Sequence, residues 1–289
     1  YTVYNADGLM NVAELVNGGK TDINITLDKN IDLTGKDWTP IGTDYDNSYK
    51  GTFDGGGHTI TGLTFTTNDE YAGLFGWLNR AGTVKNVVME GVQITSNQIY
   101  GGSIGGVVGY SWGTIENCSV SGSVSGTVYV GGVVGVQIGG SITGCSSSAT
   151  VKGTVDVGGV AGQTNSSATL TACYATGNVI IEMDPKKNIA GGSLVGMNAG
   201  SSLLACYATG NVTSTGSSTG NVHIGGFLGD NYTTVTACYW KNNHEQGIGY
   251  NRKSTGATKV DGSVVTWQKA VDAMNTALQN AGSEWRYEL

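Results

Sequence analysis

The chain has 289 residues and a net charge of −7, and only 13% of its residues are charged, against about a quarter in ordinary domains. Gly accounts for 48 residues without a Gly-X-Y period, which excludes collagen, and the apolar fraction of 39% argues against a disordered chain. No basic stripe or long apolar run occurs, so we expect neither nucleic-acid binding nor a membrane-spanning segment.

Residues 1–22 are predicted to form a helical cap. The chain opens at Tyr1 without a signal segment, so we expect either that one has been removed or that this is one domain of a longer protein. Asn5 and Asp7 are N-cap candidates, and two glycines follow the helix at Gly18-Gly19. One helical face carries the apolar side chains of Leu9, Val12, Ala13 and Val16.

Residues 23–71 are predicted to form the irregular first turns of an all-β fold, with strand-like stretches at Ile23–Leu33 and Gly51–Phe65. An acidic loop lies between these stretches, and its oxygen atoms suit calcium. Because the spacing is not that of an EF-hand, a solvated loop is the default interpretation and calcium is a weak alternative. The candidate ligands are Asp44, Asp46, Asn47 and Asp54. We predict no cofactor elsewhere.

Residues 72–240 contain six copies of a short repeat in which two apolar residues precede a Gly. The spacing between successive copies is 33, 26, 27, 34 and 33 residues, counted between Gly76, Gly109, Gly135, Gly162, Gly196 and Gly229. Each copy holds three short apolar-punctuated runs separated by Gly, Ser and Asn, which predicts a parallel β-solenoid with about three strands per turn. Two longer insertions, Ile180–Ala190 and Thr213–Val222, are expected to bulge outward as loops.

All five cysteines occupy the same position of the repeat, at Cys118, Cys145, Cys173, Cys206 and Cys238. An odd count at regular spacing does not fit a disulfide framework, and side chains on stacked rungs would lie parallel, which a disulfide dihedral angle disfavours. Because Val87 takes this position in the first copy, we predict a buried ladder of free thiols. Zinc is the alternative, but a ladder along one edge offers no tetrahedral arrangement.

Aromatic residues follow the Cys in the last three copies. If Cys points inward, the period of two along a strand turns the next residue outward. Such an exposed stripe would bind sugar rings or a protein partner, or would only stabilise the sheet by stacking. The candidate ligand-binding residues are Tyr174, Tyr207, Tyr239 and the adjacent Trp240. A second aromatic patch is expected near the second and third turns, from Tyr100, Tyr110, Trp112 and Tyr129.

Residues 241–289 are predicted to cap the C-terminal end of the solenoid. An amphipathic helix is expected near residues 266–279, because one helical face would carry Trp267, Val271, Met274 and Leu278. Caps at both ends would cover sheet edges that otherwise invite aggregation. The whole chain, 1–289, is therefore expected to be a single solenoid domain.

The recurring Gly-Gly-apolar-apolar-Gly unit, as in Gly105–Gly109 and Gly131–Gly135, resembles the GLUG motif of bacterial surface proteins. The segment Gly51–Leu63 is similar to the one that precedes such repeats in secreted proteins of gut Bacteroidetes. The resemblance implies a right-handed parallel β-helix in an exported, adhesin-like setting at the cell surface. GLUG repeats also occur beside IgA-cleaving metallopeptidase domains, but here His244–Ile248 begins the H-E-x-x-H zinc motif and departs from it at the last position.

The sequence argues against catalysis. Between Gly91 and Ile181 the only charged residues are Glu116, Lys152 and Asp156, so a carboxylate pair there needs a partner from elsewhere in the chain. The three histidines, His58, His223 and His244, lie in different repeats and share no motif. We therefore expect a non-catalytic, secreted or surface-displayed module that recognises a carbohydrate or a host surface protein. A structural spacer of a larger surface protein is one alternative, and a polysaccharide lyase or hydrolase is another.

Overall fold

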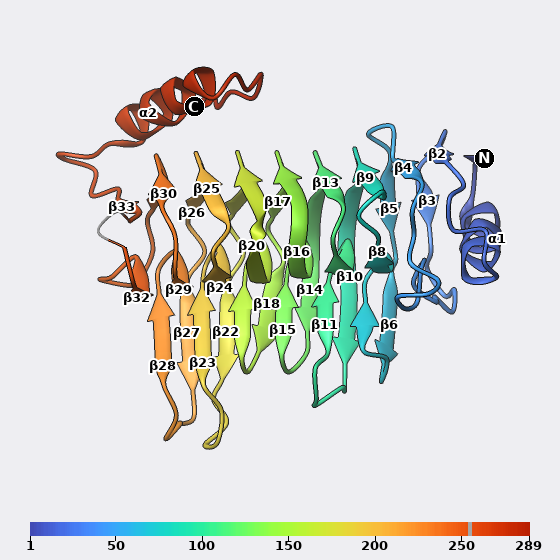
Figure 1. Cartoon of the computed structure of the whole chain (residues 1–289), viewed down its shortest axis with the longest axis horizontal. Helices are drawn as coiled ribbons and strands as arrows, with labels where there is room; N and C mark the ends of the chain where they lie inside the picture. The colour runs from blue at the N-terminus through green and yellow to red at the C-terminus, as the bar shows by residue number, and fades with distance from the viewer. Residues whose placement is uncertain (254–255) are drawn as a thin grey trace.

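The computed structural model describes residues 1–253 and 256–289, and at Ser166 it describes the backbone only. The chain winds into a parallel β-solenoid of about seven turns with two short helices, as the sequence predicts (Figure 1). Three sheets run along the axis. Every pairing between strands is parallel among the described residues, so each side chain stacks on its counterpart one turn away.

The largest sheet, sheet A, has 14 strands, which are β1 (Thr2–Val3), β2 (Ile25–Leu27), β4 (Thr52–Asp54), β8 (Phe75–Leu78), β9 (Thr83–Lys85), β12 (Val108–Ser111), β13 (Thr114–Glu116), β16 (Val134–Thr143), β20 (Ala161–Thr171), β24 (Val195–Ala199), β25 (Ser202–Leu204), β29 (Leu228–Asn231), β30 (Val235–Thr236) and β32 (Ile248–Asn251).

Sheet B has 13 strands, which are β3 (Ile31–Asp32), β5 (Thr59–Thr61), β6 (Thr64–Thr67), β10 (Val88–Ser96), β14 (Ser119–Ser125), β17 (Ser146–Ser147), β18 (Thr150–Gly153), β21 (Tyr174–Ala175), β22 (Val179–Glu182), β26 (Tyr207–Ala208), β27 (Val212–Thr215), β31 (Tyr239–Trp240) and β33 (Thr258–Lys259). Sheet C has 6, which are β7 (Tyr71–Ala72), β11 (Ser103–Gly105), β15 (Tyr129–Gly131), β19 (Asp156–Gly158), β23 (Ile189–Gly192) and β28 (Val222–Gly225). The central parts of the two predicted insertions, residues 183–188 and 216–221, form the long loops between β22 and β23 and between β27 and β28, whereas the ends of both insertions belong to those strands (Figure 1).

The Gly repeat forms the corner between sheets C and A. A Cβ atom at Gly131 would lie 2.0 Å from the Val134 carbonyl oxygen, and one at Gly135 would lie 2.5 Å from the Ile104 nitrogen. The apolar residues between these glycines, Val133 and Val134, are fully buried. The motif therefore combines a backbone that only Gly permits with side chains that fill the core.

The corner between sheets A and B is a ladder of left-handed residues, one immediately before each Cys or its Val counterpart. These residues have φ between 48° and 61° and are Asn86, Asn117, Gly144, Ala172, Ala205 and Ala237. Asn117 Nδ2 donates to Asn86 Oδ1 at 2.9 Å, which stabilises the first rungs. Ala carries a strain of about 1–2 kcal/mol in this conformation, so its use in the later turns needs another reason.

The five cysteines form the predicted buried ladder of free thiols. Each lies at most 2% exposed, and the thiols donate to backbone carbonyls, as Cys173 does to Thr171 at 3.3 Å. Burial raises the pKa of Cys145, Cys173 and Cys206, so these thiols stay protonated and unreactive.

Thiol labelling gives a direct check of this register. We expect the native protein to leave all five thiols unmodified by a water-soluble disulfide reagent over minutes, and denaturant to release all five. The measurement is the absorbance of the released thiolate. Rapid modification of most thiols in the native state would show that the Cys position faces solvent.

Helix α1 (Ala6–Asn17) caps the N-terminal end, as predicted (Figure 1). The Asn5 side chain accepts a hydrogen bond from the Gly8 N–H, and Leu9 and Val16 are buried in the same core as Ile25 of β2. The α1 helix thereby covers the apolar edge of the first turn.

Helix α2 (Trp267–Asn280) forms where the sequence predicts it, but its expected place at the end of the solenoid is wrong. Val271, Met274 and Leu278 pack against Ala172 and Ala205 on the A–B corner, so α2 lies along the flank of several turns (Figure 1). An amphipathic pattern identifies an apolar face but not the surface that it covers.

Candidate functional site

The predicted Tyr residues do stack on one another from turn to turn, but the C-terminal segment of the chain covers part of this stripe. Tyr174 and Tyr207 stack in parallel with ring centroids 4.8 Å apart. Tyr207 also makes edge contacts with Trp267 of α2 at 5.6 Å and with Tyr287 at 5.5 Å. Burial raises the pKa of Tyr207 to about 12. The stripe therefore serves in part as the docking surface of the C-terminal segment.

Trp240 does not extend the stripe. Its side chain is only 2% exposed and lies in the solenoid core, because the period of two that turns Tyr239 outward turns Trp240 inward. The expectation that Trp240 is an exposed ligand-binding residue is wrong.

The acidic loop does not gather its four candidate ligands. Asp44 accepts a hydrogen bond from the Asn47 N–H at 2.9 Å, which lowers the pKa of Asp44, whereas Asp46 is exposed. Asp54 lies on β4, pairs with Lys85 at 3.3 Å and accepts from Asn86. Within residues 1–253 and 256–289, no group of three or more His, Cys, Asp or Glu side chains is placed to hold a metal ion.

The best candidate for a binding site lies at the corner between sheets C and A. Two ladders of stacked side chains, one from each sheet, face each other there. On sheet C the stacked positions are Tyr71, Ser103, Tyr129, Asp156, Ala190 and His223. On sheet A they are Trp77, Tyr110, Val136, Gln163, Met197, Asp230 and Tyr250. We call the surface between these ladders the corner groove. It follows the solenoid axis, since both ladders gain one residue with every turn.

The N-terminal part of the corner groove is an aromatic cluster. The rings of Tyr71 and Trp77 meet edge to face at 4.7 Å, and those of Trp77 and Tyr110 lie 4.3 Å apart. All three side chains are half-buried, so each presents part of its ring to solvent. Partly exposed rings of this kind are the platforms on which sugar rings stack.

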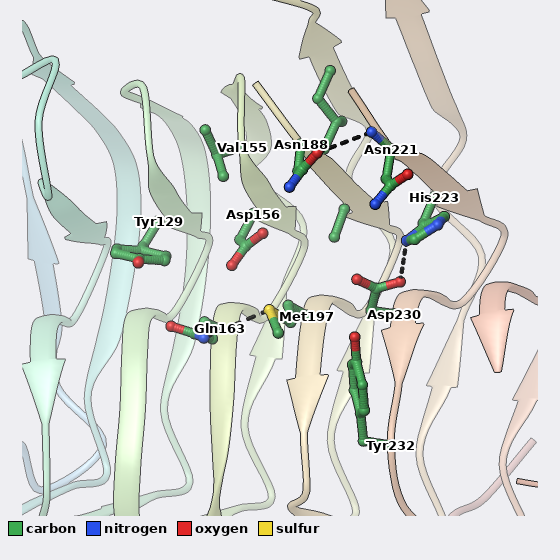
Figure 2. Close-up of a pocket in the computed structure, with 12 residues that line it drawn as sticks. Tyr129, Val155, Asp156, Gln163, Asn188, Met197, Asn221, His223, Asp230 and Tyr232 are labelled. Atoms are coloured by element: carbon green, nitrogen blue, oxygen red, sulfur yellow. Dashed lines mark hydrogen bonds and ion pairs between the residues drawn. The ribbon is translucent and has the colours of Figure 1, made fainter. Parts of the chain in front are cut away.

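The C-terminal part of the corner groove opens into a pocket of about 300 Å³ (Figure 2). Asp156 enters from sheet C, whereas Asp230 enters from sheet A two turns further on. The Nδ1 atom of His223 lies 2.5 Å from Asp230 Oδ1. The lining is completed by Tyr129, Val155, Gln163, Asn188, Ile189, Ala190, Met197, Asn221 and Tyr232.

Both carboxyl groups in the pocket resist ionisation. Burial, together with the nearby charge of Asp230, raises the pKa of Asp156 to about 7. Burial also raises the pKa of Asp230, although His223 and Arg252 oppose that shift. A carboxylate pair in a partly closed pocket is typical of a functional site, because folding alone gains nothing from it.

Sequence reasoning misses this pair. In the sequence Asp156 is an isolated acid that needs a partner from elsewhere, and Asp230 supplies that partner from a repeat two turns away. His223 shares no motif with the other histidines, yet it contacts Asp230. Aligning the repeats on their glycines and comparing the residues that flank the corner would reveal the pair. Tyr110 and Tyr129 of the second predicted patch do line the corner groove, whereas Tyr100 is 74% exposed in a loop.

Comparisons with known proteins agree with the repeat architecture. Residues 100–125 and 126–152 match the GLUG motif, which confirms the resemblance seen in the sequence. Halomucin of Haloquadratum walsbyi is 38% identical over 120 residues, which cover 38% of this chain and 1% of that protein. A provisionally named Gly-rich membrane protein of Evansella cellulosilytica is 34% identical over 129 residues, covering 42% of this chain and 14% of the relative.

A solved structure shares the fold along nearly the whole chain. It is a provisionally named immunoglobulin A1 protease from Bacteroides ovatus, with a TM-score of 0.70 and 19% identity over 96% of this chain and 87% of that one. At this identity the likeness shows the fold alone. In the His244–Ile248 segment, His244 Nε2 lies 3.0 Å from the Val212 carbonyl oxygen and Glu245 pairs with Lys259. No helix among the described residues is long and apolar enough to cross a bilayer.

Proposed function

We propose that this protein is a secreted or surface-displayed recognition module that binds an extended glycan along the corner groove. The main support for this proposal is that the aromatic cluster and the polar pocket lie along the same two ladders of stacked residues. Successive sugar units of an extended chain would meet first stacking platforms and then hydrogen-bonding groups. Half-buried rings and neutral amides, such as those of Gln163 and Asn188, are the groups that bind carbohydrates without a cofactor.

The surface setting is part of the same proposal. It is supported by the GLUG motifs in residues 100–152 and by a relative that is named as a membrane protein. A low charge content and a surface rich in Ser, Thr and Asn suit contact with neutral polymers outside the cell.

Binding to a glycan array, followed by titration of each hit, tests the proposal. We expect saturable binding that weakens roughly two- to twelvefold in each of the variants Tyr110→Ala and Tyr129→Ala, since a stacked ring contributes about 0.5–1.5 kcal/mol. Tyr174→Ala is the matched control, because Tyr174 is also a half-buried stacked ring but lies on the opposite corner. Melting curves of the variants verify that each one is folded.

Two outcomes would contradict the corner groove as the binding surface. If binding is lost in Tyr174→Ala but retained in Tyr110→Ala and Tyr129→Ala, the glycan binds at the Tyr stripe on sheet B and not in the corner groove. No saturable binding to any glycan or mucin would favour the structural spacer instead.

A further inference from the structure

Asp156 is a buried acid without a partner. Its side chain is 6% exposed, and its carboxylate forms no hydrogen bond or ion pair with any residue that the structure describes. Figure 2 shows the carboxylate directed into the pocket. Buried carboxylates are normally paired, so Asp156 lacks the partner that such a group usually has, and the pocket leaves its carboxyl group open to a ligand.

Asp230, across the pocket, differs in having basic side chains as neighbours. His223 contacts its carboxylate, and the positive charge of Arg252 lies close enough to favour its ionised form. Arg252 is itself held over the ring of Tyr232, with 4.6 Å between its guanidinium carbon and the ring centroid. The basic side chains of the pocket therefore act on Asp230, and neither of them contributes to the pKa shift of Asp156.

The rest of the pocket suits a small cation that carries N–H donors. Tyr129 stands beside Asp156 on the sheet C ladder, and the side chains of Gln163, Asn188 and Asn221 also line the pocket. Amide oxygens accept hydrogen bonds, and aromatic rings attract cations through their faces. The pocket volume of about 300 Å³ admits one sugar unit rather than a bare ion alone.

We propose that the pocket between Asp156 and Asp230 is a subsite for a primary ammonium group carried by an amino-sugar unit. This inference rests on the proposed glycan-binding function and specifies the ligand class at one end of the corner groove. An ammonium group offers three donors and one positive charge, which are what Asp156 lacks. Uronic acids and other anionic units are excluded by repulsion.

A metal ion and a neutral hydroxyl explain the pocket less well. The described residues contain no group of three or more acidic, His or Cys ligands for a metal. A hydroxyl would satisfy a hydrogen bond but would not favour the ionised form of either acid. A cation with N–H donors supplies the hydrogen bond and also offsets the repulsion that the two acids would feel when both are ionised.

Calorimetric titration with a fully deacetylated glucosamine oligomer and with the matching N-acetylglucosamine oligomer tests the inference. The two probes differ only in the acetylation, and hence the charge, of the amine. We expect the charged oligomer to bind about tenfold more tightly or better, because a hydrogen bond to a charged group adds about 1.5–3 kcal/mol when the charge is paired. Asp156→Asn should remove this preference, so that the two oligomers bind with similar affinity.

Non-specific attraction between a cationic oligomer and an acidic protein is the main competing explanation. Asp46→Asn is the matched control, because it removes the same charge from an exposed loop outside the pocket. It should keep the full preference. If Asp46→Asn and Asp156→Asn weaken binding of the charged oligomer equally, the subsite proposal is wrong.

Proton release supplies a second readout. The titratable groups around Asp156 are Tyr129 on β15, His223 on β28 and Asp230 on β29, and Arg252 after β32 acts on Asp230. Near pH 6 Asp156 is largely protonated, so binding of an ammonium group must displace its proton. The measured enthalpy should then depend on the ionisation enthalpy of the buffer, and this dependence should vanish in Asp156→Asn.

The outcomes separate the two proposals. If both oligomers bind equally and Tyr110→Ala weakens both, the corner groove binds glycans but the ammonium subsite is wrong. If neither oligomer nor any other glycan binds, both proposals are wrong.

Discussion

Gly135→Ala is expected to destabilise the solenoid by about 3 kcal/mol or more. The added Cβ would lie 2.5 Å from the Ile104 nitrogen, 2.6 Å from the Gly109 carbonyl oxygen and 2.8 Å from the Ser103 carbonyl carbon. All three are backbone atoms of the neighbouring turn, so no side chain can rotate away to make room. Urea unfolding followed by circular dichroism measures the loss as a lower transition midpoint.

Gly139→Ala is the matched control in the same strand, β16. Its Cβ would meet the Trp112 ring at 3.5 Å, which is an ordinary contact, and its backbone φ is not positive. We expect its stability to lie within about 1 kcal/mol of the parent protein. Equal stability of the two variants would mean that the Gly repeat does not act through close backbone approach.

The fold is predictable from the repeat because the glycines and cysteines recur at the same positions in successive turns. A residue that recurs at the solenoid period must sit at one place in the cross-section, so the spacing predicts that Gly135 and Cys145 each stack on their counterparts in neighbouring turns. The position of Gly135 at a corner is known only from the structure. The stacked pairs along the sheets are direct consequences of that period.

The corner groove is harder to predict for the same reason. Its residues change from turn to turn, so the repeat gives no sign that Asp156 and Asp230 matter together. Two rungs of about 4.8 Å separate their strands along the axis, and only the corner brings sheets C and A close enough for their charges to interact. In this solenoid the candidate site is therefore formed by residues that differ between turns, and not by the residues that recur in every repeat.

The site of α2 has a sequence signal of a different kind. The left-handed corner carries Asn86 and Asn117 in early turns but Gly144, Ala172 and Ala205 where the C-terminal segment docks. A Cβ at Gly144 would lie 2.2 Å from the ring of Trp285, so the ring needs a residue without a side chain there. The backbone strain of Ala172 and Ala205 at this corner is explained by the apolar surface that their side chains provide for Met274 and Leu278 to pack on.

Asp156→Asn is expected to stabilise the protein at pH 8, by up to about 4 kcal/mol. The pKa of Asp156 rises from 3.8 to about 7 on folding, which is roughly three units at about 1.4 kcal/mol each. Because the folded state holds the proton more tightly, the contribution of this group to stability falls as the pH rises from about 4 to about 7. Asn mimics the protonated acid and removes that loss.

The pH dependence identifies the cause of the gain. The difference in unfolding free energy between Asp156→Asn and the parent protein should be largest above pH 7, shrink as the pH falls and become small near pH 4, where Asp156 binds a proton in the unfolded chain as well. Urea titrations at pH 4, 6 and 8 would measure it. A constant difference would attribute the gain to packing instead. A gain confined to high pH, together with loss of the ammonium preference, would mean that Asp156 serves ligand binding at the expense of the stability of the fold.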